Sequence, residues 1–388
     1  MSAIDLRRSP SGIPLGIGIA GIAVCGIGAI FNPVQFFRSY LIGYLLWLGV
    51  ALGCLAILML YHMVGGRWGF LIRRILEAAT RTFPLLAVLF LPIVFGAREL
   101  FPWANREAVR ADPVLVAKAP YLNLPFFVIR AAILFAVWIA LSALLNRWSA
   151  EQDETDDPAL GIRLQRLSAP GLILYAATTF FASVDWLMSL APHWYSSIFG
   201  MAFMVGHGLS AMALVILAVR FLANSEPFSR VTSRFVFRDL GNLQFMFLML
   251  WGYMTFSQLI IVWSGNLPEE ISWYLPRLHS SWKFMSLFIL LSYFGAPFLL
   301  LLSRRVKEDI RFLSRVAGWV LAMRVLDLIW LIEPIFHPAG ISLSVLDFAA
   351  PVGIGGVWTA VFLWQLERRP LLAIHDPRME AAMEVRHG

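Results

Sequence analysis

The feature that most constrains this chain is a series of long apolar runs separated by short polar segments. A helix that crosses the hydrocarbon core of a bilayer needs about 20 mostly apolar residues. We expect ten such helices, at roughly 13–31, 41–63, 84–101, 125–146, 170–190, 197–222, 240–262, 280–302, 316–333 and 346–366. The third run contains Pro84 and Pro92, and its helix could start earlier, near Leu76. The sequence therefore predicts an all-α, polytopic membrane protein.

The composition agrees with this class. Hydrophobic residues make up 59% of the 388 residues and charged residues only 14%, against roughly 45–50% and 25% in soluble domains. Because so little charged surface cannot keep this much apolar sequence in water, we expect residues 1–388 to form a single integral membrane domain.

The distribution of positive charge predicts the orientation. The segments on the N-terminal side of the predicted spans hold 22 of the 31 Lys and Arg residues, and the opposite segments hold 7. Cytoplasmic loops of membrane proteins carry an excess of Lys and Arg. We therefore expect both termini to be cytoplasmic. This placement explains the net charge of +7 without a nucleic-acid partner.

The segments between the spans suggest how the helices are organised. We expect an external loop at 102–124, a cytoplasmic loop at 147–169 with a solvated acidic stretch at 151–157, and a cytoplasmic tail at 367–388. Spans two to five and six to nine are predicted to form two four-helix bundles, with spans one and ten at the periphery. Gly12, Gly16 and Ala20 recur every four residues and could form a packing face, or belong to an ordinary glycine-rich helix.

The residues for a metal centre are missing from the sequence. Cys25 and Cys54 are the two cysteines, too few for a cysteine-ligated iron–sulfur cluster, and a C-x-x-C-H haem motif is absent. A haem b would need two buried His at matching depth, but His207 is near the centre of its span and His62 near the end of another. We expect this chain to bind no cofactor of its own, with a quinone contact left open.

Charged residues inside the predicted spans need a reason, because a charge at the bilayer centre costs about 2.5–3.5 kcal/mol. Span nine contains Arg324, Asp327 and Glu333, span five ends near Asp185, and span six has His207 at its centre. These five residues are candidates for a proton path, in which Arg324 would keep Asp327 ionised. The alternative is a structural ion pair and a hydrogen-bonded core histidine.

A second set of titratable residues falls on the predicted external face. Its members are His193, Glu269, Glu270, Arg277, His279 and His337. With the aromatic residues among them, they could form the mouth of a quinol or proton site, or a docking face for a redox partner. They could equally be solvated charges in an interfacial belt of Trp and Tyr.

Two motifs and a tail carry a family resemblance. They are S-V-D-W-L-M-S-L-A-P-H-W-Y-S-S-I-F-G at 183–200, Y-M-T-F-S-Q-L-I-I-V-W-S-G-N-L-P-E-E-I-S-W-Y at 253–274, and P-L-L-A-I-H-D-P-R at 370–378. The chain resembles the smaller NrfD-like (polysulfide-reductase-like) membrane subunit of bacterial alternative complex III, a quinol:electron-acceptor oxidoreductase. The resemblance implies a place in the bacterial inner membrane, and acidic and His positions that fall on Asp185 and His207.

The resemblance also implies a set of partners. They are a sister NrfD-like subunit, an iron–sulfur subunit, multihaem and monohaem cytochrome c subunits, small membrane subunits and lipids. In that family the sister subunit usually oxidises the quinol. This chain would then be a subunit of an oxidoreductase complex, not the catalytic redox subunit, and would contribute architecture and a proton path in a respiratory or photosynthetic chain.

Two other functions remain open from the sequence. A secondary transporter would need helices broken at corresponding places in two repeats, but Pro84, Pro92, Pro297 and Pro334 do not obviously correspond. A purely structural membrane anchor would leave the buried charged residues without a need for protonation.

Overall fold

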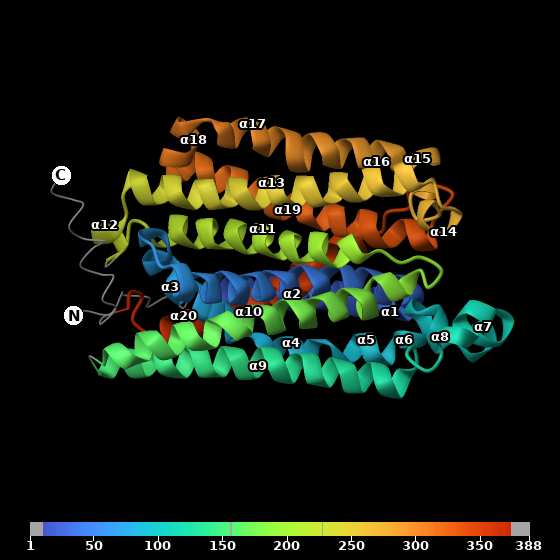
Figure 1. Ribbon diagram of the computed structural model, residues 1–388, viewed down its shortest axis with the longest axis horizontal. Coiled ribbons are helices and arrows are strands. Elements are labelled where there is room, and N and C mark those ends of the chain that lie inside the picture. The colour runs from blue at the N-terminus through green and yellow to red at the C-terminus, as the bar shows by residue number, and fades with distance from the viewer. Residues whose placement is uncertain (1–10, 156, 227, 374–388) are drawn as a thin grey trace.

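The computed structural model describes residues 11–155, 157–226 and 228–373. Within these ranges the chain is helical and contains no strand, so the predicted all-α fold is confirmed. Nine helical segments of this described part are long and apolar enough to cross a membrane: 12–31, 33–64, 67–95, 124–154, 159–190, 197–222, 234–265, 282–302 and 346–367. They lie side by side along one axis (Figure 1). The protein is therefore a polytopic membrane protein.

The remaining predicted span is α19, Ile310–Phe336. Its 27 residues include Arg324, Asp327 and Glu333. Because of these charged residues, α19 lacks an 18-residue stretch as poor in charge as those in the nine segments named above. It nevertheless lies among the other crossings (Figure 1) and packs against α2 and α11. The side chains of all three charged residues are buried, so α19 turns its polar groups toward other helices.

The first predicted four-helix bundle is formed by α2, the α3–α6 segment, α9 and α10. Their bounds are α2 Pro33–Val64, α3 Arg67–Thr80, α4 Phe83–Leu89, α5 Leu91–Phe95, α6 Ala97–Leu100, α9 Leu124–Glu154 and α10 Pro158–Trp186. Pro84 and Pro92 lie in the first turns of α4 and α5. Because a proline cannot continue a preceding helix without losing a hydrogen bond, this crossing is a series of short helices.

The second bundle is formed by α11 Ser197–Leu222, α13 Arg234–Gly265, the α16–α17 segment and α19. The eighth crossing consists of α16 Trp282–Ile289, a π-helical turn η3 Leu290–Gly295 and α17 Ala296–Leu302. The two bundles meet where α2 packs along α11. The core of the molecule is therefore this α2–α11 seam.

The first and last crossings, α1 Gly12–Phe31 and α20 Leu346–Glu367, pack on each other and on α2. Their contact is made by glycines: a Cβ on Gly21 would lie 2.6 Å from the Cα of Gly353. Gly12, Gly16 and Ala20 lie on a different face that packs on no helix in the described part of the chain, because nothing lies within 4 Å of a Cβ built on Gly12 or Gly16 and Ala20 is exposed. The periodicity of small residues did not show which face meets a partner helix.

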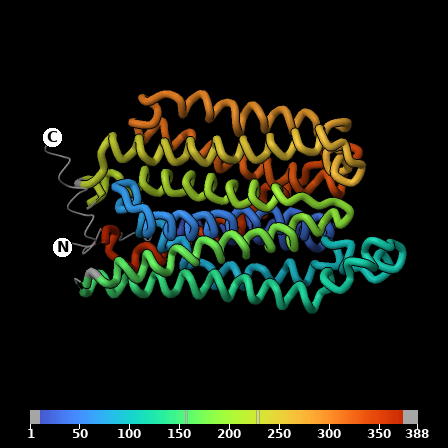
Figure 2. The backbone as a smooth tube through the Cα atoms, in the orientation of Figure 1, coloured from blue at the N-terminus to red at the C-terminus, as the bar shows by residue number. Residues whose placement is uncertain are grey.

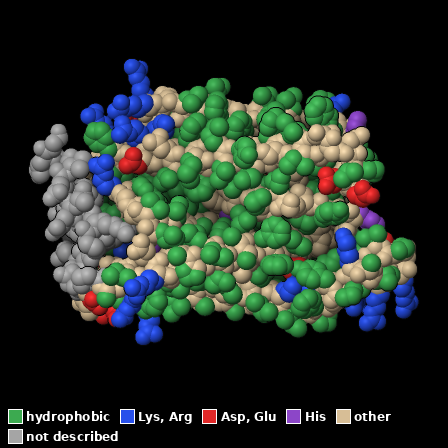
Figure 3. Space-filling model, viewed as in Figure 1, with side chains coloured by type: hydrophobic (Ala, Val, Ile, Leu, Met, Phe, Trp, Pro, Cys, Tyr) green, Lys and Arg blue, Asp and Glu red, His purple; other side chains and the backbone are tan. Residues whose placement is uncertain are grey.

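The ends of the bundle differ, and we name them after the short helices they carry. The α12 end holds α12 Phe228–Val231 and α18 Arg304–Glu308; the α15 end holds η1 Pro102–Ala104, α7 Arg106–Ala111, α8 Pro113–Lys118, η2 Met188–Leu190, α14 Pro268–Ile271 and α15 Leu275–His279. The α7–α8 arm extends beyond the helices (Figure 2). On the face shown in Figure 3, Lys and Arg gather at the ends and hydrophobic side chains cover the middle.

Two predicted boundaries differ from the structure for one physical reason. The third crossing does start before Pro84, as expected, but at Arg67 and not near Leu76, and the predicted loop 147–169 is mostly helix, with α9 ending at Glu154 and α10 beginning at Pro158. Arg74 is buried and pairs with Glu77 at 2.6 Å and with Asp153. These pairs extend α3 and α9 beyond the apolar runs, so residues 151–154 are helical. Glu151, Glu154 and Asp157 are exposed, as expected of a solvated acidic stretch. The tail beyond 373 and residue 156 lie outside the described residues.

Candidate functional site in the second bundle

The centre of the candidate site is an ion pair within α19. Arg324 donates to the carboxylate of Asp327 one helical turn away, and each residue is only 3% exposed. The guanidinium lies against Gly206 of α11, where a Cβ would come within 2.7 Å of Nη1 and Nη2. A glycine at 206 therefore lets the arginine approach the neighbouring helix.

His207 follows Gly206 and lies in the seam between α2 and α11. It is 2% exposed, and neither ring nitrogen has a hydrogen-bond partner among the described residues. Gly49 and Gly53 of α2 make room for it, since a Cβ on Gly49 would lie 2.6 Å from the His207 ring and one on Gly53 would lie 2.2 Å from its carbonyl oxygen. His207 and the Arg324–Asp327 pair are thus brought to one region, as the sequence predicts.

A small cavity borders this ion pair. Its volume is about 40 Å³, and its lining comes from α11, α13, α19 and the segment before α15: Phe199, Ala202, Phe203, Trp251, Thr255, Gln258, Trp273, Tyr274, Arg324, Asp327, Trp330 and Leu331. A water molecule needs about 10–15 Å³ by this kind of measure. The Gln258 amide nitrogen is buried without a partner among the described residues, so the cavity has the room and the polar groups to hold water.

Asp185 is not part of this centre. Its carboxylate accepts hydrogen bonds from Nε and Nη2 of Arg130 in α9, at 2.7 and 3.0 Å. The same guanidinium donates to the Tyr121 carbonyl at 2.8 Å and lies 3.9 Å from the centre of the Tyr121 ring. Asp185 therefore belongs to an ion pair inside the first bundle, and does not face α19.

Glu333 lies in a third place, at the α15 end between α19, α2 and α20. Its side chain is fully buried, and neither carboxylate oxygen has a hydrogen-bond partner among the described residues. His337 Nε2 lies 3.7 Å from one of these oxygens and 3.2 Å from Nη1 of Arg38. Burial lowers the pKa of His337, the Arg38 charge lowers it further, and Asp347 opposes both.

The predicted external-face residues all lie at the α15 end but do not form one cluster. His193 pairs with Asp112 at 2.6 Å. Arg277 is buried and donates to the carbonyls of Trp273, Trp330 and Leu331, at 2.5, 3.2 and 2.8 Å, so it holds α15 on α19. Glu269 is exposed and Glu270 half-buried on α14.

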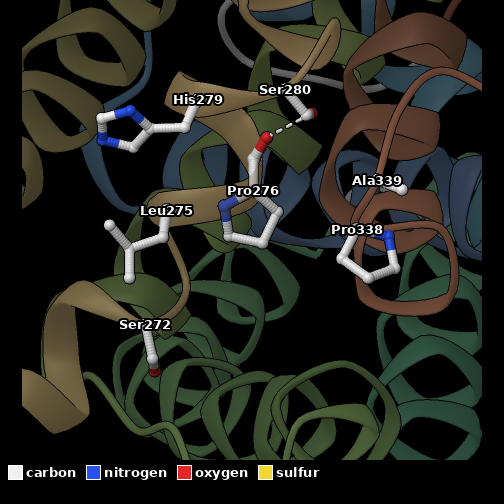
Figure 4. Close-up of a pocket in the computed structure, with 7 residues that line it drawn as sticks. All are labelled: Ser272, Leu275, Pro276, His279, Ser280, Pro338 and Ala339. Atoms are coloured by element: carbon white, nitrogen blue, oxygen red, sulfur yellow. Dashed lines mark hydrogen bonds between the residues drawn. The ribbon is translucent and has the colours of Figure 1, made fainter.

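His279 lines a shallow groove of about 480 Å³ beside the segment after α19. The other lining residues are Ser272, Leu275, Pro276, Ser280, Pro338 and Ala339. In Figure 4, Pro276 lies opposite Pro338 and Ala339 of the α19–α20 connection, whereas the His279 ring points away from them. This groove is separate from the cavity beside Arg324.

Several charged residues that matter to the structure were not among the predicted candidates. They are Arg130, Arg38 and Asp347, whose partners lie on or next to other helices. Arg130 did give a signal, since it is a charge inside an apolar run. In the ranges the structure describes, no group of three or more His, Cys, Asp or Glu side chains could hold a metal ion.

The fold and these sites define a polytopic, all-α integral membrane protein with buried ion pairs. No protein-family model matches the chain. Among curated proteins it is similar to antigen peptide transporter 2 of Homo sapiens, with 33% identity over 132 residues. These residues make up 34% of this chain, and they span 18% of the length of the transporter.

Proposed function

We propose that this protein is a membrane subunit of a bacterial quinol:electron-acceptor oxidoreductase complex, of the kind formed by the smaller NrfD-like subunit of alternative complex III. It would lie in the inner membrane with both termini cytoplasmic. Its partners would be the sister NrfD-like subunit, an iron–sulfur subunit, cytochrome c subunits and small membrane subunits. The observation that best supports this proposal is the buried centre of Arg324, Asp327 and His207.

Each group of this centre has one property that suits proton transfer. Arg324 cannot lose its proton, so it serves to stabilise a negative charge on Asp327. Neither ring nitrogen of His207 has a hydrogen-bond partner in the part of the chain that the structure describes, and an imidazole can accept a proton on one nitrogen and release it from the other. Water in the adjacent cavity would link Asp327 to the aromatic residues at the α15 end.

The same cavity leaves room for the quinone contact in the proposal. Phe199, Trp251 and Trp273 line it with aromatic surface, and Gln258 adds a polar group. Its volume of about 40 Å³ is too small for a quinone ring without movement of these side chains. A role in architecture and proton transfer therefore has more support than a role in quinol oxidation.

Complementation tests this proposal. We expect deletion of the chain in its native host to abolish quinol-dependent reduction of membrane-bound c-type haem. The variant Asp327→Asn combined with Arg324→Gln should restore assembly and electron transfer but lower the number of protons released per electron. The matched control is Arg304→Gln, which breaks an exposed pair with Glu308 at the α12 end. Normal proton release in the double variant would make the buried pair structural.

A transporter is the second candidate, because the similarity to antigen peptide transporter 2 favours it. Against it, the irregular crossings are the second of the first bundle and the third of the second bundle, so they do not occupy corresponding places in two repeats. A structural anchor is the third candidate. Uptake assays on vesicles with the purified protein alone would separate a transporter from the other two.

A further inference from the structure

The feature that carries a further inference is the buried carboxyl group of Glu333. It lies near the C-terminus of α19 with 0% exposure, and neither carboxylate oxygen accepts a hydrogen bond of regular geometry from a described residue. The amide of Gln35 is close to it but donates its hydrogen bond to Asp347. An ionised carboxylate buried without donors is far more costly than the neutral acid. The structure therefore favours a protonated Glu333 in the state it shows.

The charges around Glu333 lead to the same conclusion. Asp347 of α20 is buried and accepts hydrogen bonds from Ser39 Oγ, Gln35 Nε2 and the Ser344 N–H, at 2.6, 3.0 and 2.8 Å. Arg38 of α2 lies 4.0 Å from the centre of the Phe336 ring, and it interacts electrostatically with the carboxyl groups of Glu333, Asp347 and Glu99. An ionised Glu333 would thus add a further carboxylate to a region with one arginine.

His337 connects this acid to the outside of the protein. The Arg38 guanidinium can only donate, so His337 Nε2 must accept in their 3.2 Å contact and is unprotonated there. The same nitrogen is 3.7 Å from Glu333 Oε2, and the His337 side chain is 34% exposed. A small movement of the imidazole from Arg38 toward Glu333 would bring a proton acceptor to the acid.

We propose that Glu333 and His337 form a proton-exchange site between the buried end of α19 and the aqueous phase at the α15 end. In the transfer, the O–H bond of Glu333 breaks and an N–H bond forms at His337 Nε2. The imidazolium then releases its other proton from Nδ1 to water, and Arg38 turns to the new Glu333 carboxylate. One proton moves in each step and no electron is transferred.

This site is separate from the Arg324–Asp327 centre. Asp327 and Glu333 are six residues apart, about 9 Å along the helix axis, and they face different helices. The inference extends the proton-path part of the proposed function. The experiment that tests it uses neither quinol nor electron acceptor. The proton-exchange site and the proposed function can therefore fail independently of each other.

Infrared spectroscopy of the full-length protein in lipid nanodiscs tests the proposal. At neutral pH we expect the C=O stretching band of a protonated carboxylic acid, absent in Glu333→Gln. Labelling with ¹³C-glutamate should shift the band in the wild-type protein and ¹³C-aspartate should not, which covers the case of a variant that fails to fold. A band that survives in folded Glu333→Gln, or responds to the aspartate label, overturns the proposal.

The role of His337 is tested by the rate at which this band shifts after transfer to D₂O. We expect the exchange to be at least about tenfold slower in His337→Gln, because the acid loses its proton acceptor. The matched control is His279→Gln, which removes an exposed histidine at the same end and should leave the rate unchanged. Exchange in His337→Gln as fast as in the wild-type protein would contradict the proposed route.

Discussion

Arg130 of α9 holds the carboxylate of Asp185 with two hydrogen bonds, 2.7 Å from Nε and 3.0 Å from Nη2. The pair lies near the α15 end of the first bundle, and Asp185 is fully buried. It joins two consecutive crossings, α9 and α10, and is separate from the Arg324–Asp327 pair of the second bundle. Each bundle therefore contains its own buried ion pair.

The first prediction concerns the Arg130–Asp185 pair. Arg130→Gln should lower the stability of the protein by roughly 3–5 kcal/mol, because it leaves a buried carboxylate without its partner. The double variant Arg130→Gln, Asp185→Asn should be less destabilised than this single variant, since no charge remains. Thermal unfolding in detergent measures both. A double variant as unstable as the sum of the two single variants would show that the residues act independently.

The second prediction concerns the glycine contact between α1 and α20. Gly21→Ala should destabilise the protein by roughly 1–3 kcal/mol, because the new methyl group meets the backbone of Gly353 and the helices must separate. Gly16→Ala on the same helix is the matched control, and its melting temperature should be unchanged or higher, since its Cβ meets open space. Equal effects of the two substitutions would contradict this packing.

The third prediction concerns orientation. A reporter fused after Gly388 should be active only in its cytoplasmic form, and one inserted after Leu267 at the α15 end only in its periplasmic form. The physical reason is the excess of Lys and Arg in the segments on the N-terminal side. A periplasmic signal after Gly388 would exchange the two faces and move Glu333 and His337 to the cytoplasmic side.

The fourth prediction concerns the α7–α8 arm and pH. Desolvation raises the pKa of Asp112, but hydrogen bonds from the Val114 N–H and His193 outweigh it and lower the pKa below its usual value. The ionised Asp112 carboxylate therefore stabilises the arm fully at pH values above about 3.9, the pKa of Asp in the unfolded chain. This stabilisation is lost as the pH falls through the lower pKa that Asp112 has in the folded protein. Hydrogen exchange in residues 106–118 should rise over that range.

The control for this prediction is Asp112→Asn, which keeps a side chain that can accept from Val114 but removes the titrating charge. Its arm should exchange faster than the wild-type arm at neutral pH and should respond less to acid. An Asp112→Asn arm with the wild-type pH response would show that another group controls the arm.

The sequence predicted the helical crossings well because the bilayer imposes a simple requirement of length and apolarity. It predicted the ion pair of Arg324 and Asp327 because both lie on one turn of one helix. It did not predict that Arg130 pairs with Asp185 or that Arg38 lies beside His337 and Phe336 near Glu333. Both arginines come from other helices, and contacts between helices depend on how each helix is rotated. It also placed Arg74 in a loop, because the contact with Asp153 of α9, which helps to neutralise its charge, joins two helices and is visible only in three dimensions.

The same limit applies to the glycines. Gly49 and Gly53 make room for His207, and Gly206 makes room for Arg324, but the sequence shows many glycines with similar spacing. A packing glycine differs from a lipid-facing one only by what lies opposite to it.

The central claim, membership in a quinol-oxidising complex, is tested most directly by mass spectrometry of the affinity-tagged chain, purified from gently solubilised membranes of its native host. We predict stoichiometric recovery of c-type cytochromes, an iron–sulfur protein and a second polytopic membrane subunit. Recovery of the chain alone, or with other proteins but without any haem protein, would contradict the account.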